Sequence, residues 1–175
     1  SSDNTARLWD AATGALQTTL KGHSGRVTSC AFSSDGTRVV TASWDNNARL
    51  WDAATGALQT TLEGHTREVA SCAFSSDGTR VVTASYDNTA RLWDAATGAL
   101  QSALEGHTDD VTSCAFSSDG TRVVTASDDN TARLWDAATG ALQTTPCLLD
   151  TSPSPRDRTR TRMPSSAWKK NANTH

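Results

Sequence analysis

The chain repeats itself every 42 residues. A Gly-His pair and a tryptophan return at this interval, as His23, His65 and His107 and as Trp9, Trp51, Trp93 and Trp135. Repeats of about 20–50 residues are small units that stack on copies of themselves, because one unit alone cannot bury its apolar surface. The period therefore predicts an array of similar modules.

Each unit contains four short runs with strand character, separated by turn signals such as Ser34-Asp35-Gly36. In the first complete copy these runs are Val27–Phe32, Arg38–Ser43, Ala48–Asp52 and Ala57–Leu62. The runs VVTAS and SCAF are apolar enough to be buried on both faces. Four antiparallel strands form one small twisted sheet, and such sheets are predicted to pack radially as blades.

Four motifs follow one another in each unit: Gly-His, Ser-Ser-Asp-Gly, Ser-x-Asp-Asn and Arg-Leu-Trp-Asp. Together they resemble the signature of the WD-repeat β-propeller family, and the resemblance covers residues 1–145. It implies an all-β fold, with a partial N-terminal blade at 1–23 and repeats at 24–65, 66–107 and 108–145. Propellers have about 4–8 blades. We therefore expect an open arc of about three full blades and one partial blade, cut from a larger propeller, and not a closed ring.

Residues 146–175 differ from the repeats in composition. They carry 6 Lys and Arg against 2 Asp and Glu, whereas residues 1–145 carry 10 against 17. Pro146 stands where each earlier copy has a leucine, and the pattern does not resume. The segment is predicted to be disordered, as a basic tail or as a non-native one. CLLDTSPSPRD and RMPSSAWKK resemble translated sequencing-adapter sequence, which favours the non-native tail.

The family resemblance also implies a structural hydrogen-bond set in each blade. Its members are a His before the first strand, a Ser ending the second, an Asp in the next turn and the Trp of the third strand. The sets are His23, Ser43, Asp45 and Trp51; His65, Ser85, Asp87 and Trp93; and His107, Ser127, Asp129 and Trp135. A buried imidazole needs a partner at both nitrogens, and a buried indole N–H needs an acceptor.

Ser, His and Asp are also the residue types of a hydrolase triad. A triad is one site with an activated nucleophile and an oxyanion hole, whereas this combination occurs once per blade. The sequence contains no HExxH, CxxC, GxGxxG or phosphate-loop motif. We therefore expect no enzymatic activity, no cofactor and no metal.

The copies differ mainly in the loops at one end of the blades. Antiparallel strands bring the residues after Gly-His to the same end as the Ser-x-Asp-Asn turn, and we call this end the variable face. The Ser-Ser-Asp-Gly turn and the Asp-Ala-Ala-Thr-Gly connection, identical in every copy, form the constant face at the other end. The candidate partner-binding residues of the variable face are Arg26, Trp44, Arg67, Glu68, Tyr86, Asp109, Asp110 and Asp128. Neutral drift of exposed positions is the alternative.

These features favour a non-catalytic scaffold that binds a protein or peptide. The alternative is the sensor or regulatory repeat region of a larger nucleotide-binding or kinase signalling protein. A net charge of −7 over residues 1–145 disfavours nucleic acid, and no apolar run is long enough to enter a membrane.

Three cysteines recur at one repeat position, as Cys30, Cys72 and Cys114. Equivalent strands of neighbouring sheets lie too far apart for a disulfide. We expect buried thiols and an intracellular, cytoplasmic location. An open arc also leaves apolar end faces in water, so we expect the chain to self-associate.

Overall fold

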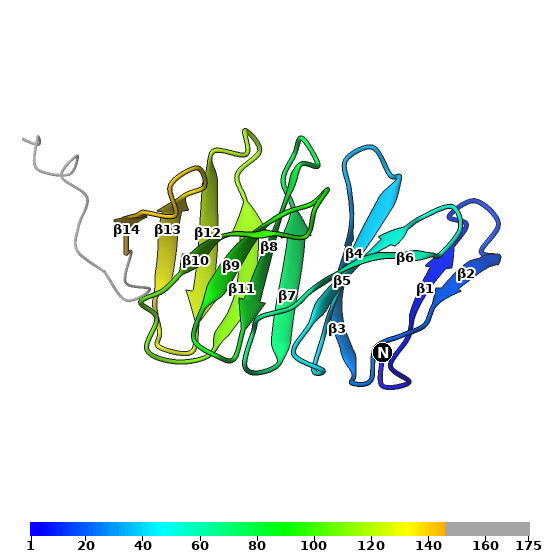
Figure 1. Ribbon diagram of the computed structural model, residues 1–175, viewed down its shortest axis with the longest axis horizontal. Helices are drawn as coiled ribbons and strands as arrows, with labels where there is room; N and C mark the ends of the chain where they lie inside the picture. Colours follow the sequence, from blue (N-terminus) through cyan, green and yellow to red (C-terminus); the bar gives the residue numbers. More distant parts are fainter. Residues whose placement is uncertain (146–175) are drawn as a thin grey trace, which may run out of the picture.

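The computed structural model describes residues 1–145, and the predicted tail at 146–175 lies outside this range. The described residues form fourteen β-strands, and no helix that could cross a membrane occurs among them. The strands make one two-stranded and three four-stranded antiparallel sheets, which follow one another along an open arc (Figure 1). This confirms the predicted all-β arc of antiparallel blades without ring closure.

We number the sheets as blades along the chain. Blade 1 consists of β1 (Ala6–Trp9) and β2 (Leu16–Leu20). Blade 2 consists of β3 (Val27–Phe32), β4 (Arg38–Ser43), β5 (Ala48–Asp52) and β6 (Leu58–Leu62). Blade 3 consists of β7 (Val69–Phe74), β8 (Arg80–Ser85), β9 (Ala90–Asp94) and β10 (Leu100–Leu104). Blade 4 consists of β11 (Val111–Phe116), β12 (Arg122–Ser127), β13 (Ala132–Asp136) and β14 (Leu142–Thr144).

The predicted strands of the first complete copy match β3, β4 and β5 in both bounds. The last strand, β6, begins one residue later than predicted, at Leu58. Ala57 still belongs to the preceding turn, because its carbonyl accepts the backbone N–H of Asp52 at 2.9 Å. Gly56 makes this turn possible with a φ of 72°, in the left-handed region that glycine adopts without strain.

Burial on both faces occurs in the second strands of blades 2 and 3 but not in their first strands, and in β12 of blade 4 buried residues alternate with more exposed ones. In β4 every residue from Val39 to Ser43 is buried, since this strand lies inside its sheet and between neighbouring blades. In β3 only Val27 is buried, and in β7 only Val69 and Cys72 are buried, with half-buried residues between them. The run SCAF is thus less buried than predicted, because its strand forms the edge of each sheet.

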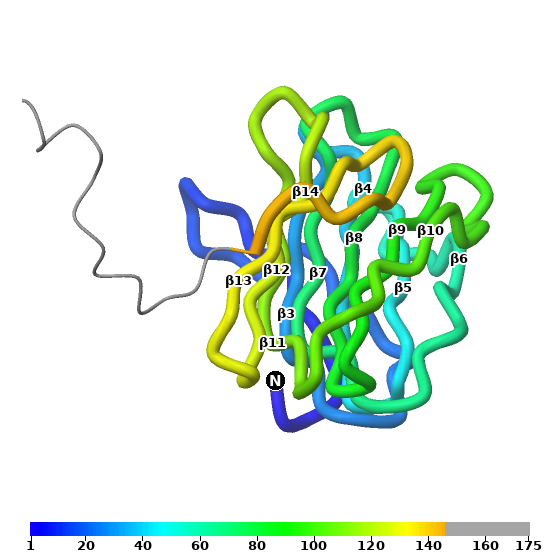
Figure 2. Tube along the Cα trace, turned by 90° about the vertical axis from the view of Figure 1, so that its left-hand side faces the viewer, coloured from blue at the N-terminus to red at the C-terminus, as the bar shows by residue number. Residues whose placement is uncertain are grey.

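The hydrophobic core lies between successive blades, whose strands stack behind one another in Figure 2. Between blades 2 and 3, Val40 and Leu50 pack with Val69 and Trp93, and blades 3 and 4 repeat this arrangement. Cys72 and Cys114 belong to these cores, and burial raises the pKa of the Cys114 thiol to about 12. Cys30, predicted to be buried, is exposed, since the two described strands of blade 1 leave this part of β3 uncovered.

Candidate functional site

Each complete blade holds a buried chain of polar side chains. In blade 3, Nδ1 of His65 lies 2.7 Å from Oδ2 of Asp87, and Nε2 lies 2.8 Å from Oγ1 of Thr83. The indole N–H of Trp93 donates to the same threonine oxygen at 2.9 Å. Since the carboxylate accepts the proton of Nδ1, Nε2 accepts the threonine hydroxyl proton. Every nitrogen of the imidazole and the indole is thus satisfied.

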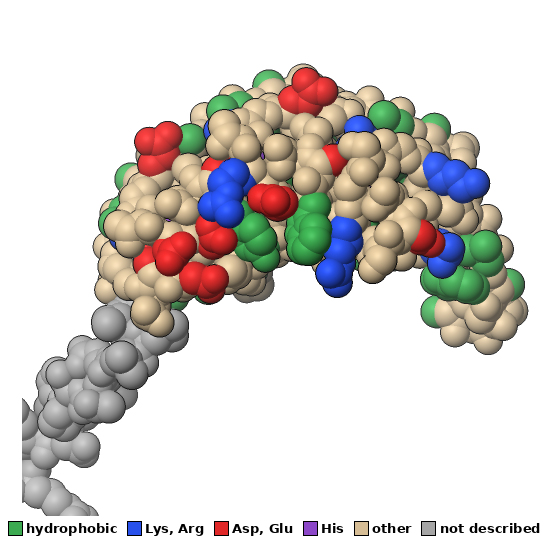
Figure 3. All heavy atoms as spheres, turned by 90° about the horizontal axis from the view of Figure 1, so that it is seen from below, with side chains coloured by type: hydrophobic (Ala, Val, Ile, Leu, Met, Phe, Trp, Pro, Cys, Tyr) green, Lys and Arg blue, Asp and Glu red, His purple; other side chains and the backbone are tan. Residues whose placement is uncertain are grey.

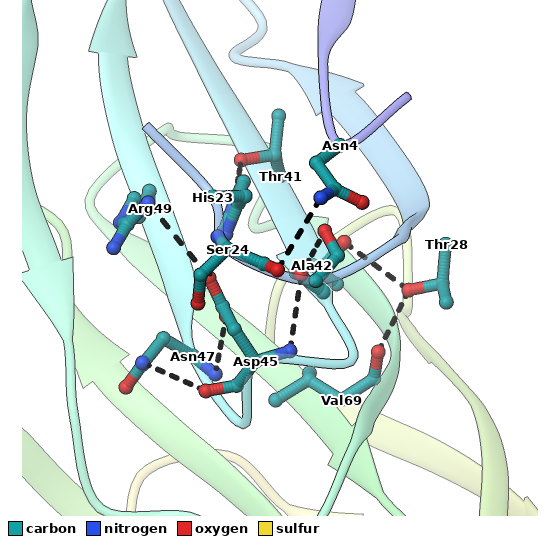
Figure 4. Close-up of polar contacts among 12 residues, drawn as sticks. Asn4, His23, Ser24, Thr28, Thr41, Ala42, Asp45, Asn47, Arg49 and Val69 are labelled. Carbon is teal, nitrogen blue, oxygen red and sulfur yellow. Dashed lines mark hydrogen bonds and ion pairs between the residues drawn. The ribbon is translucent and has the colours of Figure 1, made fainter. Parts of the chain in front are cut away.

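The same arrangement occurs in blades 2 and 4. Figure 4 shows the blade 2 set, in which Thr41 points at His23 and Asp45 approaches from the turn. Nε2 of His23 lies 2.7 Å from Oγ1 of Thr41, and Nδ1 lies 2.8 Å from Oδ2 of Asp45. In blade 4 the equivalent residues are His107, Thr125, Asp129 and Trp135.

The hydroxyl in this chain is not the one that was predicted. The prediction assigned the serine that ends the second strand, whereas the structure places a threonine two residues earlier beside the imidazole. Ser43 instead donates to the carbonyl of Gly25 at 2.9 Å and accepts the backbone N–H of Asp45 at 3.1 Å. Ser85 and Ser127 repeat these contacts. The sequence did contain a signal for the correct residue: a polar threonine stands inside the apolar run VVTAS in each of the three complete copies.

The aspartate of each set connects the buried chain to the variable face. Asp45 accepts the backbone N–H of Ser24 at 3.1 Å through Oδ2 and that of Asn47 at 3.1 Å through Oδ1. One carboxylate therefore holds both loops of the blade in place. Burial alone would raise the pKa of Asp45, but the hydrogen bond from His23 and those from the two backbone N–H groups lower it overall. The aspartate thus remains ionised.

The buried chain has no arrangement suited to catalysis. Thr83 and Ser85 are buried, and the oxygen of Thr83 already engages both His65 and Trp93. A nucleophile needs access to substrate and an oxyanion hole beside it. Among residues 1–145, no three His, Cys, Asp or Glu residues gather in a way that could hold a metal ion. The chemistry available here is structural hydrogen bonding.

On blade 2, the variable face presents an exposed tryptophan that is paired with an arginine. The side chain of Trp44 is 46% exposed, and the guanidinium of Arg26 lies over its ring, 5.2 Å from the centroid. The backbone joins the same two loops, since the N–H of Trp44 donates to the carbonyl of Arg26 at 2.9 Å. An exposed indole held in place by a cation is a preorganised contact surface.

A second group on the variable face joins blades 3 and 4. Nη1 of Arg67 donates to the carbonyl of Tyr86 at 2.6 Å and to Oδ1 of Asp110 at 2.9 Å. Glu68 lies beside this arginine, with Oε2 3.8 Å from its Nε. Asp109 and Asp128 are exposed. Figure 3 shows this face, with hydrophobic side chains near the concave edge and acidic ones gathered toward the blade 4 end. The predicted residues therefore share one face, as two groups.

Comparison with known proteins agrees with this architecture. The family model "WD domain, G-beta repeat" (WD40) matches residues 14–52, 56–94 and 98–136, well over half of the chain. The chain belongs to the WD40 repeat family.

The WD40 repeats are staggered relative to the blades. Each matched segment contains the last strand of one blade and the first three strands of the next, as residues 14–52 contain β2 to β5. Every repeat therefore links two sheets covalently, which fits a fold whose core lies between sheets.

One curated relative is a guanine nucleotide-binding protein subunit beta of Schizosaccharomyces pombe (strain 972 / ATCC 24843). It is 43% identical to the WD40 chain over 42 residues, which is one repeat period. The match covers 24% of this chain and 14% of the relative. The chain thus spans about a seventh of that protein by this match, and the likeness concerns the WD40 unit.

Proposed function

We propose that this WD40 chain is a non-catalytic scaffold that binds a protein or peptide through its variable face. The observation that carries the proposal is the Arg26–Trp44 pair, an exposed indole under a guanidinium, with a backbone hydrogen bond joining the two loops that carry them. Exposed aromatic and arginine side chains on a rigid support are typical binding anchors. The fold does not require the aromatic group, because blade 4 carries Asp128 at the same position.

The distribution of charge supports a partner of mixed character. The blade 2 end of the variable face presents Arg26, whereas Asp109 and Asp128 lie exposed on blade 4. Such a gradient orients a partner and increases its association rate more than it adds affinity. Residues 1–145 carry a net charge of −7, which disfavours binding to the phosphates of nucleic acid. The thiols of Cys72 and Cys114 are buried without disulfides, which supports an intracellular, cytoplasmic location.

The relative supports a role in protein assembly. Its name makes it a subunit of a guanine nucleotide-binding protein, and a subunit works by contact with other chains. We infer that the WD40 chain likewise belongs to a protein complex. The alternative, that the chain is the sensor or regulatory repeat region of a larger nucleotide-binding or kinase signalling protein, also implies contact with other protein surfaces.

The experiment compares the two faces. Trp44→Ala and Tyr86→Ala are each expected to weaken binding of the isolated native partner by about 1–3 kcal/mol, because they remove aromatic anchors. Thr55→Ala on the constant face is the control and should leave the affinity unchanged. Thermal melts of all three variants verify the fold. Loss of binding in Thr55→Ala, with the aromatic variants unaffected, would move the binding site to the constant face.

A further inference from the structure

Blades 2 and 3 have the same backbone arrangement at the variable face. The N–H of Trp44 donates to the carbonyl of Arg26 at 2.9 Å, and the N–H of Tyr86 donates to the carbonyl of Glu68 at 3.0 Å. Trp44 and Tyr86 occupy one repeat position, and Arg26 and Glu68 occupy another. Blade 3 also lies between two four-stranded sheets, as an interior blade does. Differences between the two sites therefore come from their side chains.

The side chains of the two sites carry opposite charge. On blade 2 the guanidinium of Arg26 lies 5.2 Å from the centroid of the Trp44 ring. On blade 3 an aromatic ring is kept as Tyr86, but a carboxylate, that of Glu68, replaces the guanidinium. Among residues 1–145 no arginine or lysine lies over the Tyr86 ring. The ring and the carboxylate both attract a cation, so the blade 3 site suits a cation that comes from another molecule.

The neighbouring arginine of blade 3 does not fill this place. Nη1 of Arg67 donates to the carbonyl of Tyr86 at 2.6 Å and to Oδ1 of Asp110 at 2.9 Å. Its Nε lies 3.8 Å from Oε2 of Glu68, which is too far for a hydrogen bond. The Glu68 side chain is 40% exposed. Two carboxylates thus share one guanidinium, and the exposed oxygens of Glu68 can accept hydrogen bonds from a partner.

The charge of the variable face decreases from blade 2 to blade 4. Three positions decide it, namely those of Gly25, Arg26 and Trp44 with their counterparts in the later copies. The charged residues there are Arg26 on blade 2, Arg67 and Glu68 on blade 3, and Asp109, Asp110 and Asp128 on blade 4, which gives +1, 0 and −3. Figure 3 shows acidic side chains gathered toward the blade 4 end. A partner with the opposite gradient is complementary along the whole face.

We propose that the variable face binds an extended peptide segment that carries a lysine or arginine and, about three residues away, an aspartate or glutamate. The cation lies between the Tyr86 ring and the Glu68 carboxylate. The acid accepts hydrogen bonds from Arg26, whose contact with the Trp44 ring leaves its N–H donors available. Packed sheets lie about 10 Å apart and an extended chain advances about 3.3 Å per residue, which sets the spacing.

This use of the variable face rests on the scaffold function proposed above and names the chemistry of the partner. It also fixes an orientation, since further positive residues of the segment lie toward blade 4, where Asp109 and Asp128 are exposed. An acidic segment would meet like charges on blades 3 and 4, and such a juxtaposition selects against a partner.

The test selects peptides from a phage library of random dodecapeptides on the immobilised full chain. Selection takes place at physiological salt, where interactions between exposed charges are screened beyond about 8 Å. We expect the selected peptides to carry a cation and an acid about three residues apart more often than the unselected library. The tightest of them is then made as a fluorescein-labelled peptide, and its affinity is measured by fluorescence anisotropy.

Glu68→Arg is the decisive variant. It introduces the residue that blade 2 carries at this position, so the fold accommodates it, and thermal melts verify this. Its affinity for the peptide should fall about tenfold or more, because the cation of the peptide now meets a like charge. Replacement of that cation by glutamate should restore most of the lost affinity for this variant.

Glu63→Lys is the matched control. It changes the charge by the same amount and introduces the residue that the preceding copy carries as Lys21. Because Glu63 precedes the Gly-His pair and lies outside the three positions of the site, the affinity should change less than about twofold.

The outcomes separate the cation site from the scaffold function. Peptides whose affinity falls with Trp44→Ala and Tyr86→Ala, but not with Glu68→Arg, would overturn the cation site and leave the scaffold function unaffected. Equal losses in Glu68→Arg and Glu63→Lys would attribute the effect to overall charge and overturn the site as well. A library that yields no binding peptide would contradict both.

Discussion

Nε2 of His65 lies 2.8 Å from Oγ1 of Thr83, and this contact links a loop to the middle strand pair of its blade. The same oxygen accepts the indole N–H of Trp93, and the other imidazole nitrogen is bonded to Asp87. Hydrogen bonds in such a chain polarise and strengthen one another in a medium of low dielectric constant. The chain runs from β9 through β8 to both loops of the variable face, so core stability and loop position depend on the same atoms.

Thr83→Val is expected to destabilise the protein by about 1–3 kcal/mol, because it leaves Trp93 without an acceptor and His65 without a donor. Thr60→Val is the matched control, since the hydroxyl of Thr60 has no hydrogen bond among residues 1–145. Chemical denaturation measures both. Equal stabilities of the two variants would contradict the network.

His65→Ala is expected to cost a similar free energy, about 1–3 kcal/mol, and to act on folding alone. The double variant His65→Ala/Thr83→Val should lose less than the sum of the single losses, because both remove the same contact. A denaturation-based double-mutant cycle measures the difference. Strict additivity would show that the two side chains are not coupled.

The free energy of unfolding is expected to decrease as the pH falls below about 6.5. Burial lowers the pKa of His23, so in this range the unfolded chain takes up a proton there that the folded chain does not. The pKa of Asp45 is also lowered, so the free energy of unfolding decreases further when the pH falls below 3.8, the ordinary pKa of this carboxyl group. Denaturant unfolding curves at pH 7.5, 6.5 and 5.5 measure the slope of the free energy of unfolding against pH. His23→Gln should reduce it, and an unchanged slope in this variant would exclude His23 as its source.

Arg80→Ala is expected to destabilise the protein by about 2 kcal/mol, because its guanidinium donates to two carbonyls of blade 4 and lies over Phe116. Arg122→Ala is the matched control, since the same repeat position on blade 4 has no such acceptor among the described residues. Thermal melts compare the two. Destabilisation of equal size would show that the contacts between blades are not the cause.

The chain is expected to self-associate as its concentration rises. Val124 on blade 4 is 42% exposed, whereas its counterparts Val40 and Val82 are fully buried between blades. Val124→Lys should reduce association, because it places a charge on this apolar face. Leu100→Lys, at an exposed position outside the contacts between blades, is the control. Sedimentation velocity should detect the difference, and a wild-type chain that stays monomeric at every concentration would refute the expectation.

The sequence alone determined the blades, their strands and the position of the turns. These features follow from local patterns: a constant period, glycines at turns such as Gly56, and short apolar runs bounded by turn residues. It also separated a variable from a constant face, because antiparallel strands return each loop to a known end. Trp44 and Tyr86 could be placed on one face by this rule without any knowledge of their contacts.

Only the tertiary structure decided which groups meet. Thr83 and Ser85 lie two residues apart on one strand, and sequence spacing does not show which of them reaches His65, 18 residues away. Arg67 meets Asp110 and Arg38 meets Ala95 across a blade boundary, at separations of 43 and 57 residues. Cys30 and Cys72 occupy the same repeat position, yet one is exposed and the other buried. Burial and pairing depend on the neighbouring blade, and no single repeat contains that information.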